Sequence, residues 1–264
     1  MKKCLKLSFR EILEALPSRL TCLLAASLTL SPGLFAATAP DLNSAGDFGV
    51  LAGGGITITG ATTIAGDIGT FPTATITGLE NLTLTGTNHA GDGVTQVAKT
   101  DLLAAYLDAA GQTPTTTFGA IYDLGSQTLG AGVYNGPSSF GLTGTLTLDA
   151  MGDPNAVWIF QAGSTLITES GSNINLIGGA QAANVFWQVG SSATFGTGTQ
   201  FVGSVLASDS ITMTTGATID GGLYALNGAV TLDTNIVQVP EPGGAVLLTV
   251  SLMAMMLTTR RRWK

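Results

Sequence analysis

A repeated unit, a short apolar strand followed by glycine, most constrains how this chain can fold. The apolar strand before Gly163 matches the one before Gly190. The same offset of twenty-seven residues aligns Gly171 with Gly198, and Gly216 follows after another eighteen. Short strands broken by glycine at recurring distances are typical of a β-solenoid, whose coils stack on one another and turn at glycine corners. An immunoglobulin-like sandwich also has short strands, but repeated strand and corner pairs favour stacked coils.

One segment, residues 92–110, departs from the β pattern. Asp92 is placed to cap the start of a helix and Gly111 to end it. The apolar residues recur at helical spacing, and they are Val94, Val97, Ala98, Leu102, Ala105, Tyr106 and Ala109. The segment predicts one amphipathic helix whose apolar stripe packs along the side of the solenoid.

The charged side chains of the central region exclude most chemistries. Between Pro40 and Val239 there are fourteen carboxylates and one basic residue, Lys99. Nucleic-acid binding draws on clustered Lys and Arg, so we expect no nucleic-acid partner. The same region has no cysteine and one histidine, His89, without a recognisable nucleophile motif, metal-spaced cluster or phosphate loop. We therefore expect no catalytic residue, no metal, no cofactor and no enzyme activity, with a structural role for His89.

The N-terminal residues 1–39 are typical of a secretory signal. Basic residues precede the mostly apolar run 20–35, which small residues follow. Signal peptidase is thus an expected partner during export. Cys4 and Cys22 lie inside this segment, so neither is expected in the mature protein.

The C-terminal residues 238–264 combine three parts at the chain end. They are Pro240, Glu241 and Pro242, then an uncharged and mostly apolar run to Thr259, then Arg260, Arg261 and Arg262. The run is long enough for a short transmembrane helix with its arginines on the cytoplasmic side, and a plain tail anchor is the simplest interpretation. The order of the parts, however, resembles the PEP-CTERM sorting signal that exosortases process in Gram-negative bacteria. That resemblance implies transient anchoring in the membrane, then delivery to the cell surface or the extracellular space.

Removing both ends leaves residues 40–237, enough for one domain with a sizeable core. Four of its segments resemble the ice-binding family, also called domain of unknown function 3494. They are 44–53 (SAGDFGVLAG), 148–161 (LDAMGDPNAVWIFQ), 184–190 (NVFWQVG) and 226–232 (LNGAVTL). The resemblance implies a mainly β fold, a discontinuous right-handed β-helix of triangular cross-section with one long α-helix packed alongside. It also implies a secreted or surface-displayed protein, here expected as a monomer, whose partner is the ice crystal surface.

The resemblance further suggests which residues contact ice. Members that bind ice often carry a loose pattern of Thr, then Ala or Gly, then any residue, then Thr or Asn, on a flat face. The candidate residues are Thr59, Thr62, Thr85, Asn88, Ser170, Asn173, Thr197, Thr199, Thr215 and Thr218. Stacked strands repeat every 4.7–4.9 Å, so equivalent threonines on successive coils would form a regular grid.

Two observations keep a second function open. Threonine is favoured in strands in any case, and Gln200 and Asp220 interrupt the pattern and leave the flatness of the face in question. The alternative is an extracellular matrix or adhesion protein that associates with exopolysaccharide and has no ice activity. A flat threonine-ruled face would favour ice, whereas a groove lined with aromatic side chains would favour sugar.

Overall fold

The computed structural model describes residues 37–240, which all belong to one compact unit. Most of the secretory signal and of the sorting signal predicted from the sequence lie outside these residues. Within residues 37–240, no helix is long and apolar enough to span a membrane.

The domain is built from three sheets, each of eight parallel strands. Sheet A runs in the order β4 (Asp67–Thr70), β1 (Phe48–Ala52), β22 (Leu223–Ala225), β19 (Ser204–Ala207), β16 (Val185–Val189), β13 (Trp158–Ala162), β10 (Gly132–Gly136), β7 (Thr116–Thr117). Sheet B runs β5 (Ile76–Thr77), β2 (Ile56–Thr59), β23 (Val230–Asp233), β20 (Ile211–Met213), β17 (Ala193–Phe195), β14 (Leu166–Thr168), β11 (Ser139–Leu142), β8 (Ile121–Asp123). Sheet C runs β6 (Leu82–Leu84), β3 (Thr62–Ala65), β24 (Ile236–Gln238), β21 (Thr218–Asp220), β18 (Gln200–Val202), β15 (Asn173–Ile177), β12 (Thr145–Asp149), β9 (Thr128–Leu129).

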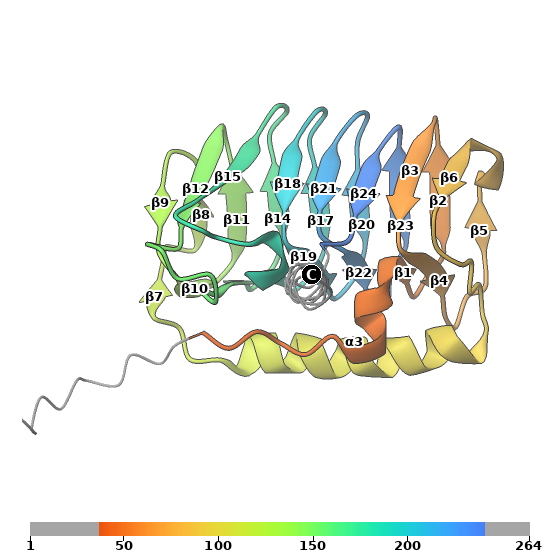
Figure 1. Ribbon diagram of the computed structural model, residues 1–264, viewed down its shortest axis with the longest axis horizontal. Helices are drawn as coiled ribbons and strands as arrows, with labels where there is room; N and C mark the ends of the chain where they lie inside the picture. The colour runs from red at the N-terminus through yellow and green to blue at the C-terminus, as the bar shows by residue number, and fades with distance from the viewer. Residues whose placement is uncertain (1–36, 241–264) are drawn as a thin grey trace, which may run out of the picture. The chain divides into compact units, whose positions relative to one another are not determined.

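Each coil contributes one strand to sheet A, then one to B, then one to C (Figure 1). The stacking order differs from the chain order, because the first coil (β1–β3) lies between the last coil (β22–β24) and the second (β4–β6). After the second coil the chain crosses to the opposite end through α3 (Gly93–Gly111) and then builds back coil by coil. The predicted mainly β solenoid with one helix is confirmed.

The repeat read from the sequence sets the pairing between coils. In sheet A, Phe160 pairs with Trp187 and Gln161 with Gln188, both at an offset of twenty-seven residues. The two rings of the first pair stack inside the solenoid with their centroids 3.9 Å apart. The repeat therefore reports the length of one coil.

The chain passes from sheet B to sheet C at what we call the B–C corner. Glycines in the left-handed region of φ occupy this corner in six coils: Gly60, Gly78, Gly144, Gly171, Gly198 and Gly216, with φ of 66° to 80°. Glycine adopts this conformation without the steric cost that a Cβ atom brings. The glycines that suggested a solenoid are thus corner residues.

Helix α3 covers the outer side of sheet A. The Asp92 carboxylate caps it by accepting from the backbone N–H of Thr95 at 2.9 Å. Its inward residues Ala98, Leu102, Ala105 and Ala109 pack on sheet A residues that include Ile159, Phe186 and Leu206 in a second apolar cluster. The predicted helix is confirmed within one residue at each end.

Two residues of the predicted apolar stripe do not belong to it. Val94 is 49% exposed and Val97 is 57% exposed. Leu103 and Leu107 also point outward and are exposed. Spacing along the chain could not separate the two sides of a helix that is apolar on both. Lys99 completes the attachment, because its Nζ donates to the carbonyl oxygens of Ala225 and Leu226 at 2.7 and 2.5 Å. Desolvation lowers the pKa of Lys99 to about 8.

Candidate functional site

The open side of sheet B is the most regular surface of the domain. Its strands alternate, with apolar side chains turned into the core and short polar ones turned outward. The repeated pattern is a threonine flanked by two core residues: Thr57 lies between buried Ile56 and Ile58, Thr194 between Ala193 and Phe195, and Thr212 between Ile211 and Met213.

Five outward-pointing threonines stand in one row across five adjacent coils. Thr57 pairs with Thr77 on one side and with Thr231 on the other. Thr231 pairs with Thr212, and Thr212 with Thr194. We call Thr77, Thr57, Thr231, Thr212 and Thr194, in this order, the threonine ladder. Adjacent members are separated by the spacing of hydrogen-bonded strands, about 4.7–4.9 Å.

The ladder ends inside the sheet. The next three coils place Ile167, Gly141 and Asp123 in the same row. Ile167 is 48% exposed and brings a purely apolar side chain, Gly141 brings none, and Asp123 brings a charge. The regular hydroxyl row thus covers five of the eight coils of sheet B.

The ladder threonines rest on a rigid base. The strand neighbours of Thr57, Thr194, Thr212 and Thr231 are fully or almost fully buried in the main core, and Ile76 beside Thr77 is partly buried against it. Thr57, Thr77 and Thr194 are exposed, and Thr212 and Thr231 are half-buried. β-branching restricts each side-chain torsion, so the row presents methyl and hydroxyl groups in a fixed arrangement.

Six of the ten residues suggested by the sequence pattern lie together along the B–C corner, beside the ladder. They are Thr59, Ser170, Asn173, Thr197, Thr215 and Thr218. Thr59 ends β2, while Thr218 and Asn173 begin strands of sheet C. The four-residue pattern therefore marks a corner between two sheets.

Two others of the ten are buried at the same corner. Thr62 is 1% exposed, and its Oγ1 donates to the Gly60 carbonyl oxygen at 3.3 Å. Thr199 is 0% exposed, and its Oγ1 lies 2.9 Å from the Thr168 Oγ1. Neither side chain reaches the surface, because in these coils the threonine that comes after the corner glycine points into the core.

Thr85 and Asn88 lie elsewhere. They follow β6 where the chain leaves sheet C, and Asn88 bridges to Ile68 of β4 in sheet A. The structure does not bring them together with the other eight residues. The pattern in the sequence recognised threonine and glycine at a turn, and this turn belongs to another corner.

The ladder itself was missed by the sequence pattern, apart from its neighbour Thr59. Four of its five members are single threonines between two apolar residues, in the triplets Ile-Thr-Ile, Ala-Thr-Phe, Ile-Thr-Met and Val-Thr-Leu, and the fifth, Thr77, lies between Ile76 and Gly78. That triplet was a usable signal, since a strand with one buried side places its middle residue outward. The four-residue pattern joins residues that are close in the chain, whereas the ladder joins residues of different coils.

Sheet C differs from sheet B on its outer side. The row that starts at Thr83 continues through Thr63, Ile236, Thr218 and Gln200. Asp220, next along the outer side of β21, has its pKa raised by partial burial. Gln200 and Asp220 both lie in sheet C, so neither interrupts the ladder in sheet B.

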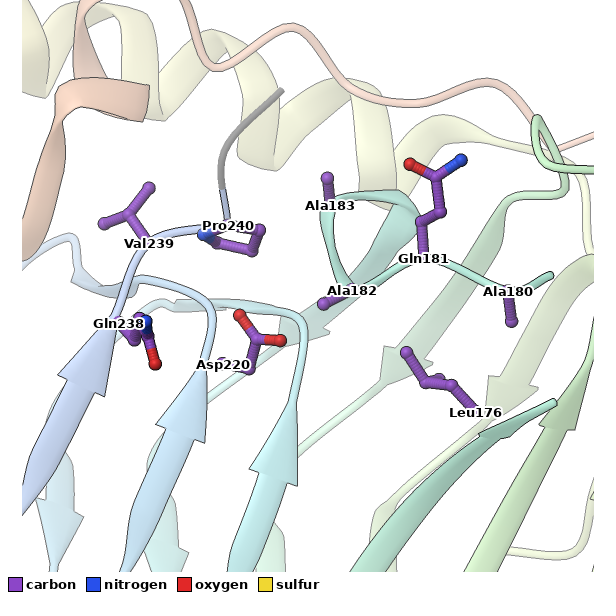
Figure 2. A pocket seen from close by; sticks show the side chains of 9 residues that line it. All are labelled: Leu176, Ala180, Gln181, Ala182, Ala183, Asp220, Gln238, Val239 and Pro240. Carbon is purple, nitrogen blue, oxygen red and sulfur yellow. The ribbon is translucent and has the colours of Figure 1, made fainter. Parts of the chain in front are cut away.

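Three shallow hollows lie on or beside sheet C. Figure 2 shows the largest, of about 440 Å³, with the loop around Ala182 on one side, Gln238 and Pro240 on the other, and the Asp220 carboxylate between them. A second, of about 370 Å³, shares Asp220 and Gln238 with it. Phe201 is the one aromatic residue that lines any of the three, and it is 2% exposed. None of these hollows offers an exposed aromatic platform.

His89 belongs to a polar cluster at the start of α3. Its Nδ1 lies 2.8 Å from the Asp92 Oδ2, and its Nε2 lies 3.3 Å from the Asp67 Oδ2 of β4. The hydrogen bond with Asp92 is the main cause that raises the pKa of His89. This cluster ties the helix start to the second coil. Across the part of the chain that the structure describes, no three potential metal ligands are grouped.

A three-sheet parallel solenoid, closed on one side by a helix and open on another with an in-register threonine row, defines a class of protein that presents a surface and not a cleft. The sequence model of the Ice-binding-like family matches residues 50–238. The chain belongs to this family.

Individual proteins support the same assignment. An ice-binding protein of Nostoc sp. (strain HG1) is 43% identical over 243 residues, covering 87% of this chain and 90% of that protein. The crystal structure of an ice-binding protein from an Antarctic biological consortium aligns with a TM-score of 0.76 at 44% identity, over 78% of this chain and 93% of that one. The structure from the Antarctic ascomycete Antarctomyces psychrotrophicus aligns with a TM-score of 0.74 at 43% identity, over 78% of this chain and 100% of that one.

Proposed function

We propose that this protein binds ice through the threonine ladder of sheet B. The observation that carries the proposal is the register of five threonines from five adjacent coils. Membership of the Ice-binding-like family supports it. The proposed activity is recognition of a crystal surface and needs no catalytic group and no cofactor.

The physical argument concerns water at the ladder. Each threonine offers a hydroxyl that can replace a water in a hydrogen-bonded lattice and a methyl group that displaces weakly held water. Ordering these side chains on binding costs little, because the strands and the buried neighbours already hold them in place. The scarcity of charge acts in the same direction, since ions hold competing hydration.

We propose that the surface threonines of the B–C corner form one rim of this site. Thr59 follows Thr57 on the outer side of β2, and its Oγ1 donates to the Leu232 carbonyl oxygen at 3.0 Å. At the next coils the Oγ1 atoms of Thr197 and Thr214 lie 3.3 Å apart. These contacts favour an ordered rim. Thr62, Thr199, Thr85 and Asn88 are left out of the proposed site.

We infer that the domain is exported as the two chain ends predict. Signal peptidase would remove the N-terminal signal, and an exosortase would process the sorting signal that begins near Pro240. A monomer at the cell surface or in the extracellular space, wound as a right-handed β-helix of triangular cross-section, completes the proposal. The place of the last strand is consistent with this proposal, because β24 ends at Gln238, two residues before Pro240.

The test compares two tyrosine variants on one coil. Thr57 and Thr63 are both exposed and point outward from adjacent strands of that coil, Thr57 from sheet B and Thr63 from sheet C. We expect Thr57→Tyr to abolish ice shaping and reduce thermal hysteresis by about tenfold, since the bulky ring holds the face away from the crystal. Thr63→Tyr should retain the activity of the unmodified protein. Circular dichroism melting of both variants controls for the fold.

Two results would contradict the proposal. If the unmodified protein neither shapes ice crystals nor inhibits recrystallisation, the fold serves another purpose, and binding to exopolysaccharide becomes the leading alternative. If Thr63→Tyr and not Thr57→Tyr removes the activity, the site lies on sheet C.

A further inference from the structure

Two residues of the B–C corner have a left-handed φ without being glycine: Ser126 between β8 and β9, and Thr234 between β23 and β24. Of the two, only Thr234 is β-branched and borders the threonine ladder. In the last coil Thr234 occupies the corner position with φ of 57°, where the coils on both sides have Gly60 and Gly216. A β-branched residue in the left-handed region is an outlier, because its Cβ substituents crowd the backbone. Backbone strain of this kind is often retained where a side chain is needed for function.

Packing does not explain the choice of threonine. A Cβ atom built on the corner glycines Gly144, Gly171, Gly198 and Gly216 would meet nothing within 4 Å. At Gly60 it would meet the Oγ1 of Thr234, so the Thr234 side chain lies over that glycine at the surface. Since Thr234 is exposed, a glycine in its place would relieve the strain and leave no cavity in the core.

The Thr234 hydroxyl has a defined partner. It donates to the Asp233 Oδ1 at 3.0 Å, while the Thr215 Oγ1 of the neighbouring coil donates to the Asp233 Oδ2 at 2.5 Å. Both oxygens of one carboxylate thus accept from threonine hydroxyls. Each of these hydroxyls is fixed toward Asp233, and the methyl group of the same threonine must therefore point in another direction.

This arrangement borders the threonine ladder. Asp233 pairs with Thr59 and follows Thr231 of the ladder by two residues, so both point to the outer side of β23. Within β20, β23 and the B–C corners that follow them, Asp233 is the only charged residue. Its bonds to two hydroxyls replace water that a free carboxylate would hold at the edge of the site.

We propose that Thr234 and Thr215 extend the ice-contacting surface over the B–C corner, with Asp233 as the positioning residue that fixes both side chains. The proposal rests on the proposed function of the ladder. It accounts for a strained threonine at a position where the neighbouring coils use glycine. It also accounts for a carboxylate at the edge of the ladder in a coil whose ladder residue is an uncharged threonine.

The decisive variant is Thr234→Gly in the purified protein. We expect its Tm to be unchanged or to rise by up to roughly 4 °C, because the left-handed strain is relieved. Thermal hysteresis should fall by about twofold, since one contact of the surface is lost. A more stable but less active protein separates a functional role from a structural one.

Ser126→Gly is the matched control. Like Thr234, Ser126 is not a glycine and has a left-handed φ, at 61°. It lies between β8 and β9 on the end coil, beyond the ladder. Its replacement should relieve similar strain and leave thermal hysteresis unchanged.

Asp233→Asn and Asp233→Ala test the positioning role. Asparagine keeps one acceptor oxygen for a threonine hydroxyl, so it should retain more activity than alanine at the same protein concentration. Equal activity of both variants with the unmodified protein would overturn the positioning role.

The outcomes also distinguish this inference from the function of the ladder. If Thr57→Tyr leaves activity intact, the ladder proposal fails first. If Thr57→Tyr removes activity while Thr234→Gly retains all of it, the extension over the corner is wrong and the ladder stands. A large loss of Tm in Thr234→Gly would make Thr234 a structural residue and would also overturn the inference.

Discussion

Sheets B and C share the same coils, the same number of strands and the same parallel pairing, and they differ in the side chains that point outward. Sheet B places threonine in the same row of five consecutive coils, whereas the corresponding row of sheet C mixes threonine with Ile236, Gln200 and Asn173. The long amides of sheet C have more rotatable bonds than threonine and form no even surface. Both sheets have the same spacing between strands, but only sheet B places threonine at equivalent positions of adjacent strands.

Sheet A differs from both open sheets because its outer side is covered. Sheet A has an outer side that is apolar, with Ile159, Phe186 and Leu206 packed under α3. An apolar outer side needs a cover, and the helix provides it. Of the three sheets, only B combines an open side with a uniform row of small, rigid and polar side chains.

The largest effect is expected from a substitution in the core that sheets B and C share. Trp187 is 1% exposed, stacks on Phe160 and donates from its Nε1 to the Val202 carbonyl oxygen at 2.9 Å. Trp187→Ala should lower the free energy of unfolding by about 3–5 kcal/mol, because it leaves a cavity. Chemical denaturation measures this value. A variant with unchanged stability would show that the stacked aromatic core is not what holds the coils together.

An intermediate effect sharpens the contrast between the sheets. Ile167 continues the row of the ladder and is 48% exposed, and Ile236 in sheet C is 50% exposed. Ile167→Thr lengthens the ladder to six coils, so thermal hysteresis should rise by about twofold. Ile236→Thr is the control on sheet C and should change nothing. A gain from Ile236→Thr alone would place the site on sheet C.

The smallest effect concerns the helix on the third side. The pKa of His89 is raised, chiefly by its hydrogen bond with Asp92 and also by the charges of Asp92 and Asp67. A histidine with a raised folded pKa contributes stability that is fully present below its unfolded pKa of about 6.5 and is lost as the pH rises through the folded pKa. Tm should therefore decrease slightly between about pH 5.5 and pH 8. His89→Gln should remove that decrease, and melting curves at several pH values check it.

The helix and the coil length follow from local features of the sequence. Asp92 is a good N-cap in almost any fold, since its carboxylate bonds an N–H three residues away. The match around Gly163 and Gly190 gives the length of one coil, twenty-seven residues, and the spacing of eighteen from Gly198 to Gly216 gives that of the shorter coils that follow. Both predictions depend on neighbours in the chain, and both agree with the structure.

The threonine pattern shows that local sequence does not predict which threonines are exposed. Thr59, Thr62, Thr197 and Thr199 stand in similar sequence surroundings, yet Thr59 and Thr197 are exposed whereas Thr62 and Thr199 are buried. Thr59 and Thr197 precede the corner glycine and point outward, whereas Thr62 and Thr199 follow it and point inward. The direction of a side chain after a turn depends on φ at the turn, which the residue names do not specify.

The sequence by itself determined the parts from which this domain is built: short strands, glycine corners that join them into coils, and one helix. Only the tertiary structure decided which residues form the candidate site. Thr57 and Thr231 are neighbours because the first coil inserts next to the last, although the chain between them forms most of the domain. The physical reason is that pairing between coils depends on which strand edges meet, and no local propensity encodes that order of stacking.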